Sequence, residues 1–174
     1  MYIVVGLGNP GEEYACTRHN TGRMAATLVG EKVKGVKVLV PDTFMNHSGK
    51  FVVKHVKSKK AAEKLIVIYD DLDLPLGSMK ISYNRSSGGH RGVESIIKAL
   101  KTEGFIRIRI GISPTTPSGK LKKPQGEKEV EKHILSEFKK KEDEVLKKVL
   151  KNVVTAVEVI TAEGLAPAMT QFNS

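Results

Sequence analysis

The chain has 174 residues, enough for one domain with a sizeable buried core. Its formal net charge of +10 at pH 7 indicates a polyanionic partner, because basic surfaces attract phosphate backbones. The single cysteine excludes an internal disulfide, the opening MYIVVG shows no secretory leader and no apolar run reaches membrane-spanning length, so we expect a cytoplasmic protein without membrane contact.

Strand-like runs rich in Val and Ile alternate with helical patterns along the chain. In chain order, strands are expected at residues 2–6, 36–40, 65–70, 79–83 and 105–112, and helices at 21–29, 48–57 and 91–101. This alternation predicts an α/β fold. The short link from Asp70 to Met79 holds Pro75 and Gly77, which favours an antiparallel neighbour and therefore a mixed sheet.

The last third of the chain contains a predicted loop followed by helices. Residues 113–126 read SPTTPSGKLKKPQG, a segment without periodicity that predicts a mobile basic loop, a candidate lid. Amphipathic helices are expected at residues 127–172. Between Val145 and Ile160 apolar residues recur mostly every fourth position, which predicts a long helix that packs on the core.

Residues 6–22 read GLGNPGEEYACTRHNTG, a glycine-rich turn that ends in an Arg-His-Asn triplet. A turn needs only small residues and a core needs only apolar ones, so this density of polar types predicts an active site. His19 is the candidate base because its side chain titrates near neutrality.

Other chemistries fit these residues less well. Three glycines match the dinucleotide fingerprint, but no helix opens at the third glycine and the first acid after the next strand, Asp42, lies too far along, so no nucleotide cofactor is expected. Cys16 beside His19 suggests a thiol nucleophile, yet a spacing of three along an irregular turn fixes no geometry. The histidines lack the spacing of a metal site, so no metal is expected.

Three more polar clusters stand at predicted strand ends, at residues 43–49 (TFMNHSG), 69–75 (YDDLDLP) and 87–92 (SGGHRG). The neighbouring carboxylates of the second cluster require a base or cation nearby. The third cluster precedes a helix, so its backbone N–H groups are candidates for binding an anion. In the strand at 105–112, alternation puts Arg107 and Arg109 on one face and predicts a basic ledge.

The chain resembles bacterial-type peptidyl-tRNA hydrolases over nearly its whole length. The matching segments, in the family's order, are GLGNPGEEYACTRHNTG, PDTFMNHSG, YDDLDLPLG, GGHRG, FIRIRIGI and the final AMTQFN. The resemblance implies one domain, residues 1–174, built as a three-layer α/β/α sandwich with a mixed central sheet. It also implies an enzyme without a cofactor that hydrolyses the ester between a peptide and the 3′ ribose of tRNA, so that the tRNA returns to translation.

The resemblance assigns roles to individual residues. His19 would act as the general base that activates water, with Asp70 orienting its ring and Asn9 completing the catalytic group. Independently of the resemblance, we expect the backbone N–H groups at residues 88–92 to stabilise the oxyanion. The substrate and the acceptor stem and CCA end of tRNA are expected to contact Tyr14, Phe44, Met45, Asn46, Gly88, Arg91, Lys80 and Arg109.

One segment and two positions depart from the family pattern. The segment between Gly22 and Val36 is shorter than in most relatives, which predicts that the sheet has lost an edge element. Most relatives carry Asn where this chain has Arg91, and we expect this cation to meet terminal phosphates or to pair with Asp70 or Asp73. Ser82 stands where a basic residue is frequent, which predicts a shift of phosphate binding to Arg85. Two functions stay open: a monomeric hydrolase, and a relative of the same fold that binds RNA without hydrolysis.

Overall fold

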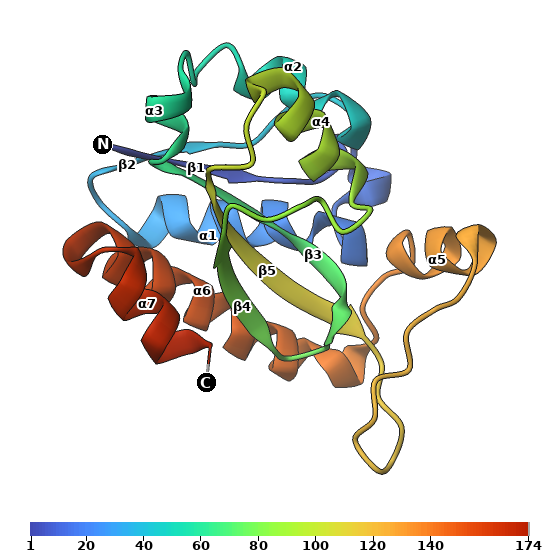
Figure 1. Cartoon of the computed structure of the whole chain (residues 1–174). Coiled ribbons are helices and arrows are strands. Elements are labelled where there is room, and N and C mark those ends of the chain that lie inside the picture. The colour runs from blue at the N-terminus through green and yellow to red at the C-terminus, as the bar shows by residue number, and fades with distance from the viewer. Residues whose placement is uncertain (174) are drawn as a thin grey trace.

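A computed structural model describes residues 1–173, and these form a five-stranded mixed sheet. The strands are β1 (Tyr2–Gly6), β2 (Val36–Leu39), β3 (Leu65–Pro75), β4 (Met79–Tyr83) and β5 (Ile106–Ser113). Their order across the sheet is β2-β1-β3-β5-β4, with only β4 antiparallel to its neighbour among these strands (Figure 1). The predicted α/β fold and mixed sheet are therefore confirmed.

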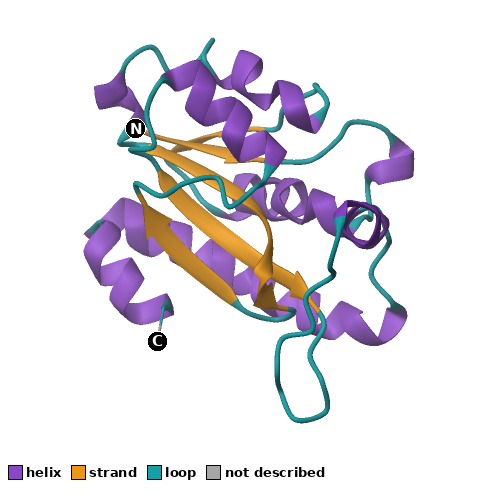
Figure 2. Cartoon of the chain, turned by 45° about the vertical axis from the view of Figure 1, so that its right-hand side comes forward, coloured by secondary structure: helices purple, strands orange, loops and turns teal. Residues whose placement is uncertain are grey.

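The helices cover both faces of this sheet and form the predicted three layers (Figures 1 and 2). One face carries α1 (Thr21–Lys32), α6 (Asp143–Glu163) and α7 (Leu165–Phe172), and the other carries α2 (Ser48–Val52), α3 (Lys59–Ala62) and α4 (Arg91–Leu100). Short 3-10 turns are η1 (Glu12–Tyr14), η2 (Arg18–Asn20), η3 (Met45–His47) and η4 (Lys140–Glu142). Helix α5 (Glu127–Ile134) lies apart from both layers, near the carboxyl ends of β3 and β5.

Strand β3 shows how the sequence produces two cores. Leu65, Ile66, Val67 and Ile68 are all fully buried. Because successive side chains point to opposite faces, Ile66 and Ile68 pack with α1 and α6, whereas Leu65 and Val67 pack with α2 and α4. A continuous apolar run is what a central strand covered on both faces requires.

The neighbour of β4 differs from the prediction. Strand β3 continues past Asp70 as far as Pro75, with a register shift after Asp71, and β4 pairs with β5 instead of β3. After β4 the chain passes through α4, and β5 then enters the sheet between β3 and β4, parallel to β3. Helix α2 also ends at Val52, earlier than the predicted helix at residues 48–57.

The predicted basic ledge on β5 is wrong, although the alternation itself is correct. Ile106, Ile108 and Ile110 lie in the core with α1 and α6, and the two arginines lie on the other face. Arg107 is fully buried there, donating from its guanidinium to the carbonyl oxygens of Ser86 (3.1 Å) and Glu103 (3.2 Å). Arg109 on the same face is also buried, so the two arginines do not form an exposed basic ledge.

Residues 114–126 lack a regular element, as predicted, apart from an isolated bridge between Thr115 and Leu121. Figure 2 shows this segment as a long loop that extends beyond the layers. Its mobility stays a prediction. Amphipathic helices follow it, in agreement with the expectation for residues 127–172. Within residues 1–173, no helix combines the length and apolar character needed to cross a membrane.

Candidate active site

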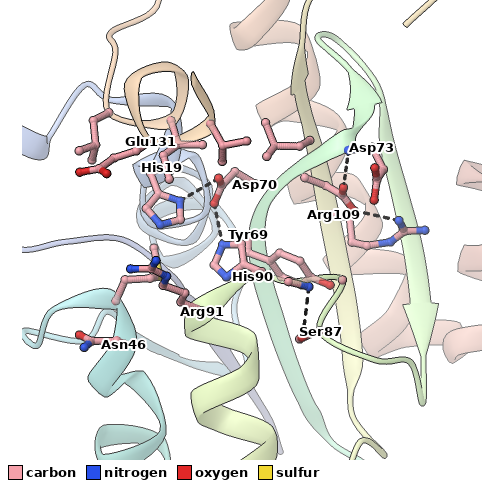
Figure 3. A pocket seen from close by; sticks show the side chains of 18 of the residues that line it. His19, Asn46, Tyr69, Asp70, Asp73, Ser87, His90, Arg91, Arg109 and Glu131 are labelled. Atoms are coloured by element: carbon pink, nitrogen blue, oxygen red, sulfur yellow. Dashed lines mark hydrogen bonds and ion pairs between the residues drawn. The ribbon is translucent and has the colours of Figure 1, made fainter. Parts of the chain in front are cut away.

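A cavity of about 520 Å³ lies where several strands reach their carboxyl ends, between the sheet, the start of α4 and α5 (Figure 3). This is the end of an α/β sheet where binding sites collect. The structure brings most of the predicted residues to its walls, namely Asn9, His19, Phe44, Met45, Asn46, Asp70, Gly88, Arg91 and Arg109. Tyr14 and Lys80 lie outside these walls. The Tyr14 ring meets Phe44 edge-on at 6.2 Å, and Lys80 is exposed in register with Arg109.

The glycines of the first motif serve close packing. A side chain at Gly22 would collide with the carbonyl group of Ile68, and one at Gly6 would collide with the backbone of Gly22. These two positions allow α1 to start directly against β1 and β3. That contact places η2, the turn immediately before α1, at the mouth of the cavity.

The central contact of the site is a hydrogen bond between His19 and Asp70. Nδ1 of His19 lies 2.8 Å from Oδ2 of Asp70, and both residues are buried. Burial opposes ionisation of Asp70, but the charges and hydrogen bonds of His19 and His90 together lower its pKa well below the ordinary value. The carboxyl group is therefore ionised and the shared proton stays on Nδ1, which leaves Nε2 of His19 free to accept a proton.

The same carboxylate raises the pKa of the His19 ring. Burial alone would lower the pKa of His19, and the cation of Arg91 acts in the same direction. The negative charge of Asp70 and its hydrogen bond outweigh both, so the pKa of His19 is raised above the ordinary 6.5. A ring that titrates above 6.5 is suited to accept a proton near neutral pH.

His90 is a further member of this network that the sequence reasoning missed. Its Nε2 lies 2.8 Å from Oδ1 of Asp70, and its Nδ1 accepts hydrogen bonds from the backbone N–H groups of Gly92 (3.2 Å) and Val93 (3.3 Å). Because Nδ1 accepts hydrogen bonds from two backbone N–H groups, the ring proton must lie on Nε2 and point to Asp70. The available signal was a histidine directly before a helix, at the N-cap, where Ser, Thr, Asp and Asn are the usual residues.

This capping changes the predicted oxyanion site. The N–H groups of Gly92 and Val93 are used by His90, and Gly89 N–H donates to Ser87 Oγ at 3.2 Å. Within the part of the chain that the structure describes, the N–H groups of Gly88 and Arg91 keep no protein acceptor. The His90 N–H donates to Ser87 O at 3.1 Å, so three of the five N–H groups at residues 88–92 are occupied and the prediction is wrong for them. It stays a prediction for Gly88 and Arg91.

The Arg-His-Asn triplet is held from three directions. Asn20 exchanges two hydrogen bonds of 2.9 Å with the backbone of Asn9, His19 bonds Asp70, and Arg18 pairs with Glu142 at 3.0 Å. The Asn9 side chain in turn accepts the backbone N–H of Met45 through Oδ1, at 2.8 Å. Its amide nitrogen is then the group left to face the cavity.

Each carboxylate of the DDLD segment has the partner that the sequence analysis required. Asp70 has its two histidines, Asp71 pairs with Arg109 at 2.9 Å, and Asp73 pairs with Lys123 at 2.6 Å. Arg109 also donates through Nε to Ser82 Oγ at 3.1 Å.

Arg91 pairs with neither Asp70 nor Asp73, which corrects that expectation. Its guanidinium lies 3.4 Å from Glu127 of α5, and both side chains are largely exposed. Figure 3 shows Arg91 between His19 and Asn46. Asp70 is instead bound by His19 and His90, and Asp73 is bound by Lys123.

His19, Asp70 and His90 also place three potential metal ligands within 4.8 Å of one another. The same atoms are joined by two hydrogen bonds of 2.8 Å, in which both ring protons point to the carboxylate. The donor set therefore fits a hydrogen-bonded triad centred on Asp70. Cys16 is exposed and does not line the cavity.

A family model, sequence relatives and solved structures all point to one family. The sequence model of the family described as "Peptidyl-tRNA hydrolase" matches residues 3–174. The chain is 39% identical to the peptidyl-tRNA hydrolase of Syntrophotalea carbinolica, covering 100% of this chain and 97% of that protein, and 40% identical to that of Koribacter versatilis, covering 99% and 92%. The crystal structure of the Acinetobacter baumannii peptidyl-tRNA hydrolase superposes with a TM-score of 0.86 at 28% identity, covering 100% of this chain and 95% of that one.

Proposed function

This chain belongs to the peptidyl-tRNA hydrolase family, and we propose that it hydrolyses the ester between a peptide and the 3′ ribose of tRNA with His19 as the general base. The observation that supports His19 is its hydrogen bond to Asp70, which leaves Nε2 as a proton acceptor in the wall of the cavity. The nucleophile is water.

In the proposed reaction, Nε2 of His19 removes a proton from water while the water oxygen attacks the ester carbonyl carbon. The imidazolium that forms keeps its Nδ1 proton on Asp70, whose negative charge stabilises it. As the bond between the carbonyl carbon and the ribose oxygen breaks, the imidazolium returns its proton to that oxygen. The products are a free peptide carboxyl group and a tRNA with its terminal hydroxyl restored.

Asp70 and His90 are proposed as positioning residues. Asp70 fixes the tautomer of His19, and His90 occupies the other carboxylate oxygen through a ring proton whose place is set by the cap of α4. The remaining N–H groups of Gly88 and Arg91 are candidates for the oxyanion that develops on the carbonyl oxygen.

Amide side chains are proposed to bind the peptide part of the substrate, and cationic side chains are proposed to bind its RNA part. The free amide nitrogen of Asn9 and the exposed Asn46 suit a peptide bond, because an amide donates and accepts without charge. On the RNA side, Lys80 and Arg85 are exposed, whereas Arg109 is partly neutralised by Asp71. We therefore expect Lys80 and Arg85 to make the main phosphate contacts of the acceptor stem and CCA end, with Tyr14 and Phe44 against the terminal nucleotides.

The test is peptide release from N-acetyl-aminoacyl-tRNA by the wild type and by His19→Ala, with unblocked aminoacyl-tRNA as the control substrate. Release from the blocked substrate alone is expected, with loss of release in the variant and unchanged salt dependence of binding. Wild-type protein that binds tRNA without releasing peptide would instead support the RNA-binding alternative. Its monomeric state and cytoplasmic location stay predictions.

A further inference from the structure

Arg18 is a buried cation beside the proposed base that takes no part in the chemistry. It is 5% exposed and does not line the cavity. Its guanidinium donates to Glu142 through two nitrogens, at 3.0 and 3.4 Å, and to Ser136 Oγ through Nε at 3.0 Å. Its planar head also lies 4.9 Å from the centre of the Phe138 ring.

All of these partners belong to residues 136–142, which join α5 to α6 and are called here the α5–α6 linker. The backbone of η2 meets the same linker, because Arg18 N–H donates to Ser136 O at 3.0 Å and Thr17 forms a bridge with Glu137. Burial acts to raise the pKa of Glu142, but its hydrogen bonds from Arg18 and the Lys139 backbone and the charges of both residues lower it overall. The pair is therefore ionised.

The linker determines where α5 returns to the body of the protein. Helix α5 contributes Val130, Glu131 and Ile134 to the cavity wall, opposite the start of α4. Figure 1 shows α5 apart from the two helical layers, with irregular segments on both sides. The contacts of Arg18 thus lie at the junction between the turn that carries His19 and the helix that closes the cavity.

An ion pair is a poor choice at this junction if stability alone is required. Removing two charges from water costs free energy, and apolar residues of similar volume are frequently as stable or more stable. The side chains of Arg18 and Glu142 are only 6% and 17% exposed. A two-nitrogen contact does supply orientation, because the planar fork of arginine fixes angle as well as distance.

We propose that Arg18 and Glu142 form a positioning pair that holds the His19 turn and the α5 wall at a fixed separation, so that the bound ester meets Nε2 of His19. Arg18 acts through the backbone of η2, and Glu142 acts through the α5–α6 linker. The inference rests on the proposed function for its kinetic consequence, and on the geometry alone for its structural consequence.

The test compares Arg18→Lys and Glu142→Gln with Glu63→Gln, which breaks an exposed ion pair with Lys60 on α3. We expect kcat to fall about tenfold in the first two variants, because small displacements of reacting groups reduce rates by up to about 10²-fold. We expect KM for the blocked substrate to change by less than about twofold, since the main proposed phosphate contacts, Lys80 and Arg85, belong to neither the η2 turn nor the α5–α6 linker. The control variant is expected to match the wild type in both constants.

A double variant, Arg18→Met with Glu142→Leu, separates positioning from stability. Apolar replacement is expected to restore the melting temperature to the wild-type value or above it, while kcat stays low. Recovery of kcat together with the melting temperature would overturn the proposal, as would wild-type kcat in Arg18→Lys and Glu142→Gln.

A measurement on the free protein distinguishes failure of this proposal from failure of the proposed function. The Nδ1 proton of His19, hydrogen-bonded to Asp70, is followed by NMR in the wild type and in each variant. We expect its resonance to broaden or shift in Arg18→Lys and to stay unchanged in Glu63→Gln. An unchanged resonance in Arg18→Lys overturns the positioning role, even if no peptide release is ever found.

Discussion

Replacing Asp70 with asparagine should trap His19 in the wrong tautomer, and the reason lies in His90. Because the cap of α4 fixes the His90 proton on Nε2, the oxygen of the new amide must face His90. The amide nitrogen then faces Nδ1 of His19 and donates to it. That contact moves the ring proton of His19 to Nε2, where water must be deprotonated, so the variant has no base.

The size of the fall in kcat follows from the groups left unpaired when the new amide turns its oxygen to His19, the orientation that keeps the ring proton on Nδ1. Rotating the amide would set two buried N–H donors against each other, at about 1–3 kcal/mol each, and loss of the negative charge beside the imidazolium costs about 1.5–3 kcal/mol more. A total of about 5 kcal/mol corresponds to a fall in kcat of roughly 10⁴-fold. Burial without the carboxylate should also lower the pKa of His19, so the acid limb of the residual activity moves to lower pH.

The assay is single-turnover release of labelled N-acetyl-amino acid from tRNA, with Asp42→Asn as an exposed control carboxylate. A second substitution, His90→Ser, keeps an N-cap for α4 and removes the ring that fixes the amide orientation. The double variant Asp70→Asn with His90→Ser should therefore be about tenfold or more faster than Asp70→Asn alone. If Asp70→Asn keeps activity within about tenfold of the wild type, or if His90→Ser makes it slower still, the tautomer argument is refuted.

Three further changes test other parts of the site. Arg91→Asn removes a cation that lowers the pKa of His19, so that pKa should rise and the acid limb of kcat/KM should move to higher pH; a shift to lower pH contradicts this. Lys80→Ala should raise KM with unchanged kcat and reduce the salt slope of tRNA binding by about one, and an unchanged slope excludes a phosphate contact. Gly22→Ala should lower the free energy of unfolding by about 1–3 kcal/mol in urea, because its methyl group meets the Ile68 carbonyl, with Gly30→Ala in the same helix as an uncrowded glycine for comparison.

The elements and the main partners of the site were predictable because they depend on local patterns. Runs rich in Val and Ile located the strands, and the neighbouring carboxylates of the DDLD segment required bases or cations that the structure supplies. The pairing of β4 with β5 was not predictable, since the link from Asp70 to Met79 is short enough for a hairpin and its length does not reveal a strand inserted later. Alternation likewise gives the face on which Arg107 lies but not the loops that cover that face.

The three anchors of the η2 turn have a consequence for how the enzyme becomes competent. Arg18 binds a carboxylate 124 residues further along the chain, whereas the partners of His19 and Asn20 occur within the first half. A fragment that ended before α5 would contain His19 and Asp70 and the hydrogen-bonded Asn9 and Asn20. It would lack the α5 wall of the cavity and Glu142, the partner of Arg18. Hydrolysis is therefore a property of the completed polypeptide, because the C-terminal third supplies α5 for the site together with α6 and α7, which cover one face of the sheet.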